Sequence, residues 1–260
     1  MDVLAPRSLV DALRLKAERP EAVPIQGGTD VMVDLNFDRA RPPALLNLNE
    51  VPELGGWSRR NGSVWLGSGL TYAEAMEEPL AELFPALAEA SRTVGGPQIR
   101  NRGTIGGNLG TASPAGDALP PLLVCGAEVR VASVRGERQV PLREFVVGPK
   151  RNVLAADELI LGVSVDAGES RQTFMKVGPR NAMVIAVVSL AMCVDDELRA
   201  AFGSAGPVPG LVSARLDEAE SFPDRVADAA SPIDDVRGTA AYRRHALRVL
   251  TRRALERCLA

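Results

Sequence analysis

Two glycine-rich segments carry the residues best suited to bind a ligand in this sequence. The first is Gln26-Gly27-Gly28-Thr29-Asp30, and the second lies within Thr93–Asp117, where seven residues are glycine. Because glycine has no Cβ, backbone N–H groups in such turns can converge on an anionic oxygen. Two turns that close on one ligand would suit a diphosphate. Either turn taken alone is as well explained by a tight connection between elements.

Acidic side chains flank both segments, foremost Asp30 and Asp117. Each carboxylate is either a loop cap or an acceptor for a ligand hydroxyl or amide, and no acid pair has a spacing that indicates a glycosidase. The only histidine, His245, lies in a basic segment, which argues against a Ser-His-Asp or Cys-His nucleophile. Redox chemistry carried by a bound cofactor fits better, because a flavin needs mainly positioning and hydrogen bonds from its protein.

Other nucleotide-binding signatures are missing from the sequence. Tyr72 stands where the third glycine after Gly67 and Gly69 would complete a dinucleotide fingerprint. The glycine-lysine-serine/threonine pattern of a P-loop is also missing. A P-loop ATPase is therefore excluded, and the Rossmann fingerprint fails.

Composition limits the remaining classes. The 260 residues include 33 acidic and 30 basic side chains, so no excess of positive charge favours nucleic acid. Neither a signal-peptide pattern nor an apolar run of bilayer length is present, which predicts a cytoplasmic protein without a membrane span. Cys125, Cys193 and Cys258 are far apart and too few for a four-cysteine zinc or iron–sulfur site on this chain.

The neighbouring segments predict the elements that position the glycine turns. Ala22–Ile25 predicts a short strand that runs into the first turn, and Ala44–Leu48 predicts a second buried strand. Thr93–Asp117 is expected to be an ordered loop and not a helix or plain strand, because interior glycine is entropically costly and proline removes a donor. Three apolar side chains within it argue against disorder: Ile99, Ile105 and Leu109.

Local signals organise the middle of the chain. The Asn61-Gly62 pair predicts a hairpin turn, because that turn needs positive φ. Thr71-Tyr72-Ala73-Glu74 has the pattern of a capping box. Helices are predicted over Leu80–Ser91, with an interruption at Pro85, and over Ala118–Cys125.

The last third of the chain predicts strands followed by helices. Three antiparallel strands are expected at Arg171–Val177, Val184–Val194 and Leu198–Ser204. A final helix is expected to start at Thr239. Its arginine stripe is either a solvated helix face or a docking surface for an acidic partner, and consists of Arg244, Arg248 and Arg252.

Five motifs occur in chain order and span nearly the whole sequence. They are Gln26–Asp30, Arg102–Asn108, Thr111–Asp117, Phe174–Arg180 and Ile233–Arg243. Together they resemble the FAD-binding medium subunit of molybdenum hydroxylases, a family that includes the flavoprotein subunits of xanthine dehydrogenase and carbon monoxide dehydrogenase. Each motif alone is a weak signal, whereas five in order are specific.

The resemblance implies an α+β fold of the vanillyl-alcohol-oxidase type, also called the PCMH type. Two FAD-binding α+β subdomains are expected, at residues 1–55 and 56–168. A C-terminal domain with a three-stranded antiparallel sheet and helices is expected at residues 169–260.

The resemblance also implies a noncovalent FAD site. The two glycine segments are expected to hold the diphosphate, the residues after them the ribityl chain, and three more distant residues the rings. The implied cofactor-binding residues are Gln26, Gly27, Gly28, Thr29, Asp30, Val94, Thr104, Ile105, Gly106, Gly107, Asn108, Thr111, Ser113, Asp117, Ile160 and Lys176. Of these, Val94 is expected near the adenine, and Ile160 and Lys176 beside the isoalloxazine.

In function, the resemblance implies an electron-transfer subunit of an FAD-dependent oxidoreductase, with no catalytic acid or base of its own. Substrate would be hydroxylated on a large molybdopterin-binding chain, and electrons would pass through a small chain with [2Fe-2S] clusters. FAD held here would then reduce NAD, oxygen or a quinone. Two alternatives stay open: a flavin-free structural subunit, and a free-standing FAD-dependent reductase of the same fold.

Overall fold

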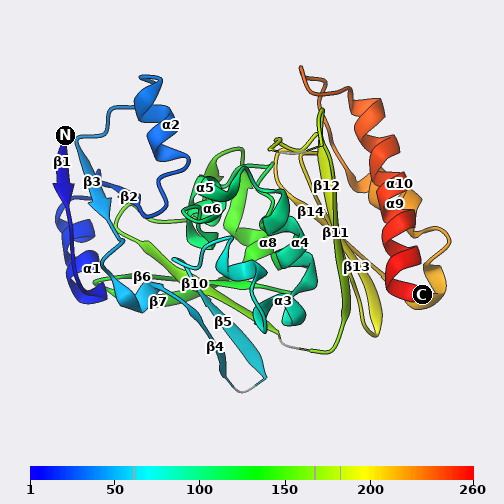
Figure 1. Ribbon diagram of the computed structural model, residues 1–260, viewed down its shortest axis with the longest axis horizontal. Helices are drawn as coiled ribbons and strands as arrows, with labels where there is room; N and C mark the ends of the chain where they lie inside the picture. The colour runs from blue at the N-terminus through cyan, green and yellow to red at the C-terminus, as the bar shows by residue number, and fades with distance from the viewer. Residues whose placement is uncertain (61, 167, 182) are drawn as a thin grey trace.

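The computed structural model describes residues 1–60, 62–166, 168–181 and 183–260. Three β-sheets of three, five and four strands follow one another along the chain, each covered by helices (Figure 1). A separate pair of short antiparallel strands, β8 (Val146–Gly148) and β9 (Arg151–Asn152), lies between the second and third sheets in sequence. The protein therefore mixes helices and strands in consecutive layers.

The first sheet is parallel and has β3 in its centre. β1 (Asp2–Leu4) and β2 (Val23–Ile25) pair with opposite edges of β3 (Ala44–Asn47). Helix α1 (Leu9–Glu18) connects β1 to β2 and packs on β3. The first glycine turn leaves the end of β2 and leads into the short helix α2 (Val31–Asn36). Both strands predicted from the sequence are present here.

The second sheet is antiparallel, with the order β4-β5-β10-β6-β7. Its strands are β4 (Trp57–Arg60), β5 (Ser63–Gly67), β6 (Glu128–Ser133), β7 (Gly136–Pro141) and β10 (Leu159–Asp166). β4 and β5 form the predicted hairpin, although Asn61 of its predicted turn lies outside the described residues. In β10, Gly162 has φ +157°, and an added Cβ would lie 2.3 Å from the Leu66 carbonyl oxygen. Only glycine fits at this position beside β5.

Most helices of the middle region lie between β5 and β6. Phe84 separates α3 (Leu80–Leu83) from α4 (Pro85–Thr93), which confirms the predicted interruption at Pro85. The prediction that Thr93–Asp117 contains no helix is wrong, because α5 (Pro97–Arg100) and α6 (Ile105–Thr111) form within it. Burial outweighs the entropic cost of glycine there, since the Ile105 and Leu109 side chains are fully buried. Helix α7 (Leu119–Val124) follows, as predicted. The short helix α8 (Leu142–Phe145) follows β7.

The third sheet confirms the three predicted strands and adds a fourth. Its order is β11 (Arg171–Val177), β12 (Val188–Val194), β13 (Glu197–Gly203) and β14 (Gly210–Arg215). The expectation of a three-stranded sheet is therefore wrong by one strand. β14 is an edge strand with only Ala214 buried, so its sequence lacks the hydrophobic pattern that predicts a strand.

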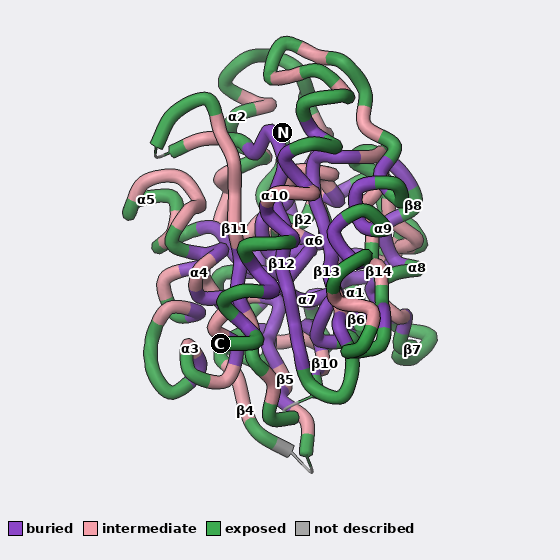
Figure 2. The backbone as a smooth tube through the Cα atoms, turned by 90° about the vertical axis from the view of Figure 1, so that its right-hand side faces the viewer, coloured by how far each residue is buried: buried purple, intermediate pink, exposed green. Residues whose placement is uncertain are grey.

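Helices cover both faces of the third sheet. On one side α4 packs on β11 and α7 packs on β12 and β13; on the other side α10 (Ala240–Leu259) packs on β11 and β12 and α9 (Phe222–Ala229) on β14 (Figure 1). Every residue of β12 is consequently buried, and Figure 2 shows this buried strand behind the exposed outer turns of α10. The third sheet and the middle region thus share one continuous hydrophobic core.

The structure places the predicted arginine stripe along the outer part of α10. The Arg248 Nε pairs with the Asp224 carboxylate, and Arg244 donates to the Ala230 carbonyl at 3.3 Å.

Within the described part of the chain, no helix is both long and apolar enough to cross a membrane.

Candidate cofactor site

A cavity of about 680 Å³ lies between the first and second sheets. Its lining brings together both glycine segments, which are more than 70 positions apart in sequence. Residues of β2, α6 and β10 complete its walls. The sequence-predicted site residues in this lining are Gln26, Gly27, Gly28, Thr29, Asp30, Val94, Thr104, Gly106, Gly107, Asn108, Thr111, Ser113, Asp117 and Ile160.

The two glycine segments touch through their backbones. A Cβ added at Gly27 would lie 2.0 Å from the carbonyl oxygen of Arg102, so a larger residue at position 27 would separate the segments. The Arg102 guanidinium reinforces the contact, because its Nη2 donates to the Gln26 carbonyl at 3.0 Å and to the Asn49 side chain at 2.9 Å. The close approach requires glycine at position 27.

The first turn offers unpaired backbone amides. Gly28 has φ +74°, a conformation that glycine adopts without strain. Among the described residues, none accepts a hydrogen bond from the amides of Gly27, Gly28 or Thr29. All three residues line the cavity. This arrangement is a nest of donors for an anionic group.

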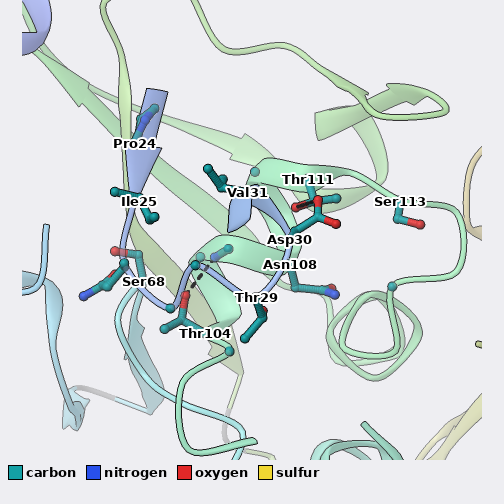
Figure 3. A pocket seen from close by; sticks show the side chains of 18 of the residues that line it. Pro24, Ile25, Thr29, Asp30, Val31, Ser68, Thr104, Asn108, Thr111 and Ser113 are labelled. Atoms are coloured by element: carbon teal, nitrogen blue, oxygen red, sulfur yellow. Dashed lines mark hydrogen bonds between the residues drawn. The ribbon is translucent and has the colours of Figure 1, made fainter. Parts of the chain in front are cut away.

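The second segment differs, because its amides already have partners. The N–H groups of Ile105 and Gly106 donate to the carbonyls of Leu70 and Ser68, at 2.9 and 2.8 Å. The Gly107 N–H donates to the Thr104 hydroxyl at 3.0 Å, which caps α6 (Figure 3). The free amides of the site thus belong to the first turn. The second segment contributes side chains and glycine residues to the cavity lining.

Gly106 is fixed by a second close approach. A Cβ at this position would lie 2.5 Å from the Ser68 Cβ and 2.6 Å from the Ser68 carbonyl oxygen. The Ser68 hydroxyl is buried without a partner in the described structure. It lies in the cavity lining and was missed by the sequence reasoning, since it stands inside a failed glycine fingerprint.

At the other end of α6, the two segments meet again through side chains. The Thr111 hydroxyl donates to the Asp30 carboxylate at 3.0 Å, and the two side chains lie next to each other in Figure 3. Burial raises the pKa of the Tyr72 hydroxyl, and the neighbouring Asn108 side chain opposes that rise. The Asn108 Oδ1 is buried and has no hydrogen-bond partner among the described residues. It is therefore an available acceptor in the cavity wall.

Asp117 and Lys176 form a buried ion pair behind the cavity. Their Nζ–Oδ2 distance is 2.6 Å, and the side chains are 4% (Lys176) and 10% (Asp117) exposed. Burial raises the pKa of Asp117, and the Lys176 ammonium opposes that rise. The second carboxylate oxygen of Asp117 is buried, and no residue in the described part of the chain donates to it. Because Lys176 belongs to β11, the third sheet supports this wall of the cavity.

Two predicted site residues lie outside the cavity lining. Ile105, the first residue of α6, is fully buried, and Lys176 reaches the cavity only through Asp117. One cationic lining residue was missed: Lys150, whose N–H donates to the Ala112 carbonyl at 3.0 Å. Its segment carries no pattern that would have identified it.

The donor and acceptor set of this cavity fits an extended dinucleotide. Free amides at the first turn suit a diphosphate, and unpaired oxygens of Asn108 and Asp117 suit hydroxyl or ring N–H donors. Apolar residues such as Ile25, Val94 and Ile160 provide surfaces for rings. In the part of the chain that the structure describes, no group of three or more His, Cys, Asp or Glu side chains could hold a metal ion. The cavity thus has the donors, acceptors and apolar surfaces of a cofactor site, and the third sheet supports one of its walls.

Comparison with known proteins identifies the family. Residues 1–166 match the family described as the FAD binding domain in molybdopterin dehydrogenase, and the chain belongs to that family. The chain is 29% identical to the putative xanthine dehydrogenase FAD-binding subunit XdhB of Escherichia coli K12, over 97% of this chain and 94% of that one. It is 32% identical to the nicotine 6-hydroxylase medium subunit of Paenarthrobacter nicotinovorans, over 96% and 94%.

Solved structures support the same fold. The structure of reconstituted CO dehydrogenase from Oligotropha carboxidovorans matches with a TM-score of 0.93 over 99% of this chain and 97% of that one, at 23% identity. The predicted α+β fold of PCMH type is confirmed. The chain is an FAD-binding subunit of the molybdenum hydroxylase family, and FAD is its cofactor.

The Thr111–Asp30 hydrogen bond provides a first test of the site. Thr111→Val keeps the shape of the side chain but removes the donor that ties α6 to the first turn. We expect FAD binding to weaken by about 0.5–1.5 kcal/mol, the ordinary net value of one hydrogen bond. Fluorescence titration of the apoprotein with FAD measures this loss. Thr111→Ser keeps the hydroxyl and should bind like the wild type, and an unchanged affinity in Thr111→Val would show that the bond is not needed.

Proposed function

We propose that this chain holds FAD noncovalently between its two glycine segments and passes electrons from iron–sulfur clusters of a partner chain to an external acceptor. Bound FAD supplies the redox chemistry, since the flavin ring accepts and releases electrons singly or in pairs. The protein supplies binding, orientation and electrostatics. The observation that carries the proposal is that Gly27, Gly28 and Thr29 line a cavity and that their amides, like the buried oxygens of Asn108 and Asp117 in its wall, have no hydrogen-bond partner among the described residues.

In this proposal the first turn binds the diphosphate through its free amides. Gly106 lets α6 pack closely against Ser68, and the Thr104 hydroxyl stands at the N-terminal end of that helix. Lys150 adds a positive charge to the wall. Each contact fixes the cofactor without any proton transfer by the chain.

The remaining residues orient the rest of the cofactor. Asn108, Ser113 and Asp117 present oxygens to the ribityl chain and the polar ring edge, while Thr111 holds Asp30 in place. Val94 would hold the adenine, and Ile160 would hold the isoalloxazine, since both line the cavity. Lys176 acts through Asp117, because its ammonium keeps that buried carboxylate in position.

We place a large molybdopterin-binding chain and a small [2Fe-2S] chain beside this subunit. Relatives named as FAD-binding or medium subunits support a multi-subunit complex. Cys125, Cys193 and Cys258 are buried free thiols, which suits a cytoplasmic complex with clusters on another chain. The three domains are proposed at residues 1–55, 56–168 and 169–260, and the external acceptor is NAD, oxygen or a quinone.

The test is the visible spectrum of the purified full-length chain before and after addition of FAD. A flavin spectrum that persists through gel filtration and is released on denaturation supports noncovalent FAD. A chain that retains no flavin even after reconstitution points to the flavin-free structural subunit. Co-expression with the neighbouring reading frames separates the remaining rival, because a free-standing reductase would purify without molybdenum or iron.

A further inference from the structure

The motif Ile233–Arg243 has no member in the cavity lining. It forms a turn ahead of α10, bonded within itself. The Asp235 carboxylate accepts the N–H groups of Arg237 and Gly238 at 2.8 and 3.3 Å, and the Thr239 hydroxyl caps α10. Such a turn explains how the helix begins. It leaves one conspicuous residue, the buried Arg243, unexplained.

Arg243 bridges two segments from a buried position. Its side chain is 3% exposed, with Nη2 donating to Asp235 at 2.5 Å and Nη1 donating to the Ser204 carbonyl at 2.5 Å. A guanidinium holds its donors in a rigid planar fork. The position of the Ser204 peptide is therefore tied to the turn through Arg243.

Ser204 continues the connection to the cavity. It follows β13 with φ +59°, and its N–H donates to the Pro114 carbonyl at 2.8 Å. Pro114 stands between Ser113 and Ala115, which both line the cavity. Space is tight here, because a Cβ added at the neighbouring Gly203 would lie 3.1 Å from the same Pro114 oxygen.

We propose that Arg243 is a positioning residue for the flavin site, acting through Ser204 and Pro114 on the cavity wall at 113–117. This inference rests on the proposed function, since it names a residue that sets the shape of the FAD site. The wall is held from the third sheet at two points: Ser204 bonds Pro114, and Lys176 bonds Asp117. Arg243 holds Ser204 in place at the first point, and Lys176 of β11 holds Asp117 at the second.

The first experiment compares Arg243→Met with Arg248→Met in the full-length chain. Both remove one arginine from α10, but Arg248 forms a partly exposed pair with Asp224 and, in the described structure, makes no hydrogen bond to the wall at 113–117. We expect FAD to bind about tenfold more weakly to Arg243→Met, with a changed visible circular dichroism of the bound flavin. Arg248→Met should retain the wild-type affinity and spectrum. Wild-type affinity and circular dichroism in a folded Arg243→Met would overturn the proposal.

The second experiment needs no variant and therefore does not depend on how well one folds. Coupling between two sites is reciprocal, so FAD must stabilise the Ser204 bond if that bond supports FAD. Hydrogen exchange of the wild-type chain is measured with and without FAD. The proposal is supported if FAD slows exchange of the Ser204 amide more than it slows exchange of the amides of β14, the neighbouring strand of the same sheet. It is overturned if FAD slows exchange equally at both places. If the wild type binds no FAD, the proposed function itself has failed.

Discussion

Gly27→Ala is expected to abolish retention of FAD by the purified chain. The added Cβ would lie 2.0 Å from the Arg102 carbonyl oxygen, and both atoms belong to the backbone framework, so no side-chain rotation relieves the overlap. The two glycine segments must move apart. Overpacking of this kind costs about 1–3 kcal/mol, and we expect a loss of FAD affinity near the upper end of that range, about 100-fold. Fluorescence titration with FAD measures it.

Gly168→Ala is the matched control for Gly27→Ala. It adds the same methyl group at a glycine where, apart from its own atoms and its chain neighbours, no atom of the described residues lies within 4 Å of the new Cβ. This variant should retain FAD like the wild type. If Gly27→Ala also retains FAD with unchanged affinity, the close contact of the two segments is not required for binding.

Lys176→Met is expected to have the largest effect on stability. It removes the partner of a carboxylate that is only 10% exposed and leaves the Asp117 charge uncompensated. Breaking a buried pair in this way costs about 3–5 kcal/mol. The free energy of unfolding from urea titration should fall by that amount. Lys150→Met, which removes an exposed ammonium elsewhere in the cavity, should change it by no more than about 0.5 kcal/mol.

The loss in Lys176→Met should depend on pH. Burial already raises the pKa of Asp117 in the folded chain, and removal of Lys176 raises this pKa further. Between the ordinary and the raised pKa, the unfolded chain binds fewer protons than the folded chain, so stability falls as pH rises through this interval. The deficit relative to the wild type should therefore be smaller in mild acid than at neutral pH.

Asp117→Asn added to Lys176→Met tests the origin of this pH dependence. The double variant has no ionisable group at either position, so its deficit should no longer grow with pH. A deficit in Lys176→Met that is the same at every pH would show that packing, and not the unpaired carboxylate, causes the loss.

Local sequence patterns predicted elements better than they predicted contacts. β2, β3, the β4–β5 hairpin and β11 to β13 follow from apolar runs and turn residues. α5 and α6 were missed because glycine argues against helices, whereas burial of Ile105 and Leu109 decides the outcome. β14 was missed because an edge strand needs no apolar face.

The site itself depended on long-range information. Local propensity cannot show that Gly27 touches Arg102, since 75 positions separate them; only the family resemblance paired the two segments. The different roles of the two segments could also be recognised only from the three-dimensional structure. Whether the amides of Gly106 and Gly107 are free depends on Ser68 and on the rotamer of Thr104, and no sequence pattern encodes either. The connection from Arg243 to Pro114 was invisible for the same reason.

Helix α6 also sets a scale for the ligand. It has seven residues and therefore measures about 10 Å along its axis. Thr104 caps one end, while Thr111 with Asp30 marks the other. A free phosphate is too short to reach both groups and can satisfy only one of them. The length of the helix thus favours binding of elongated ligands over small anions, even though both could enter the same cavity.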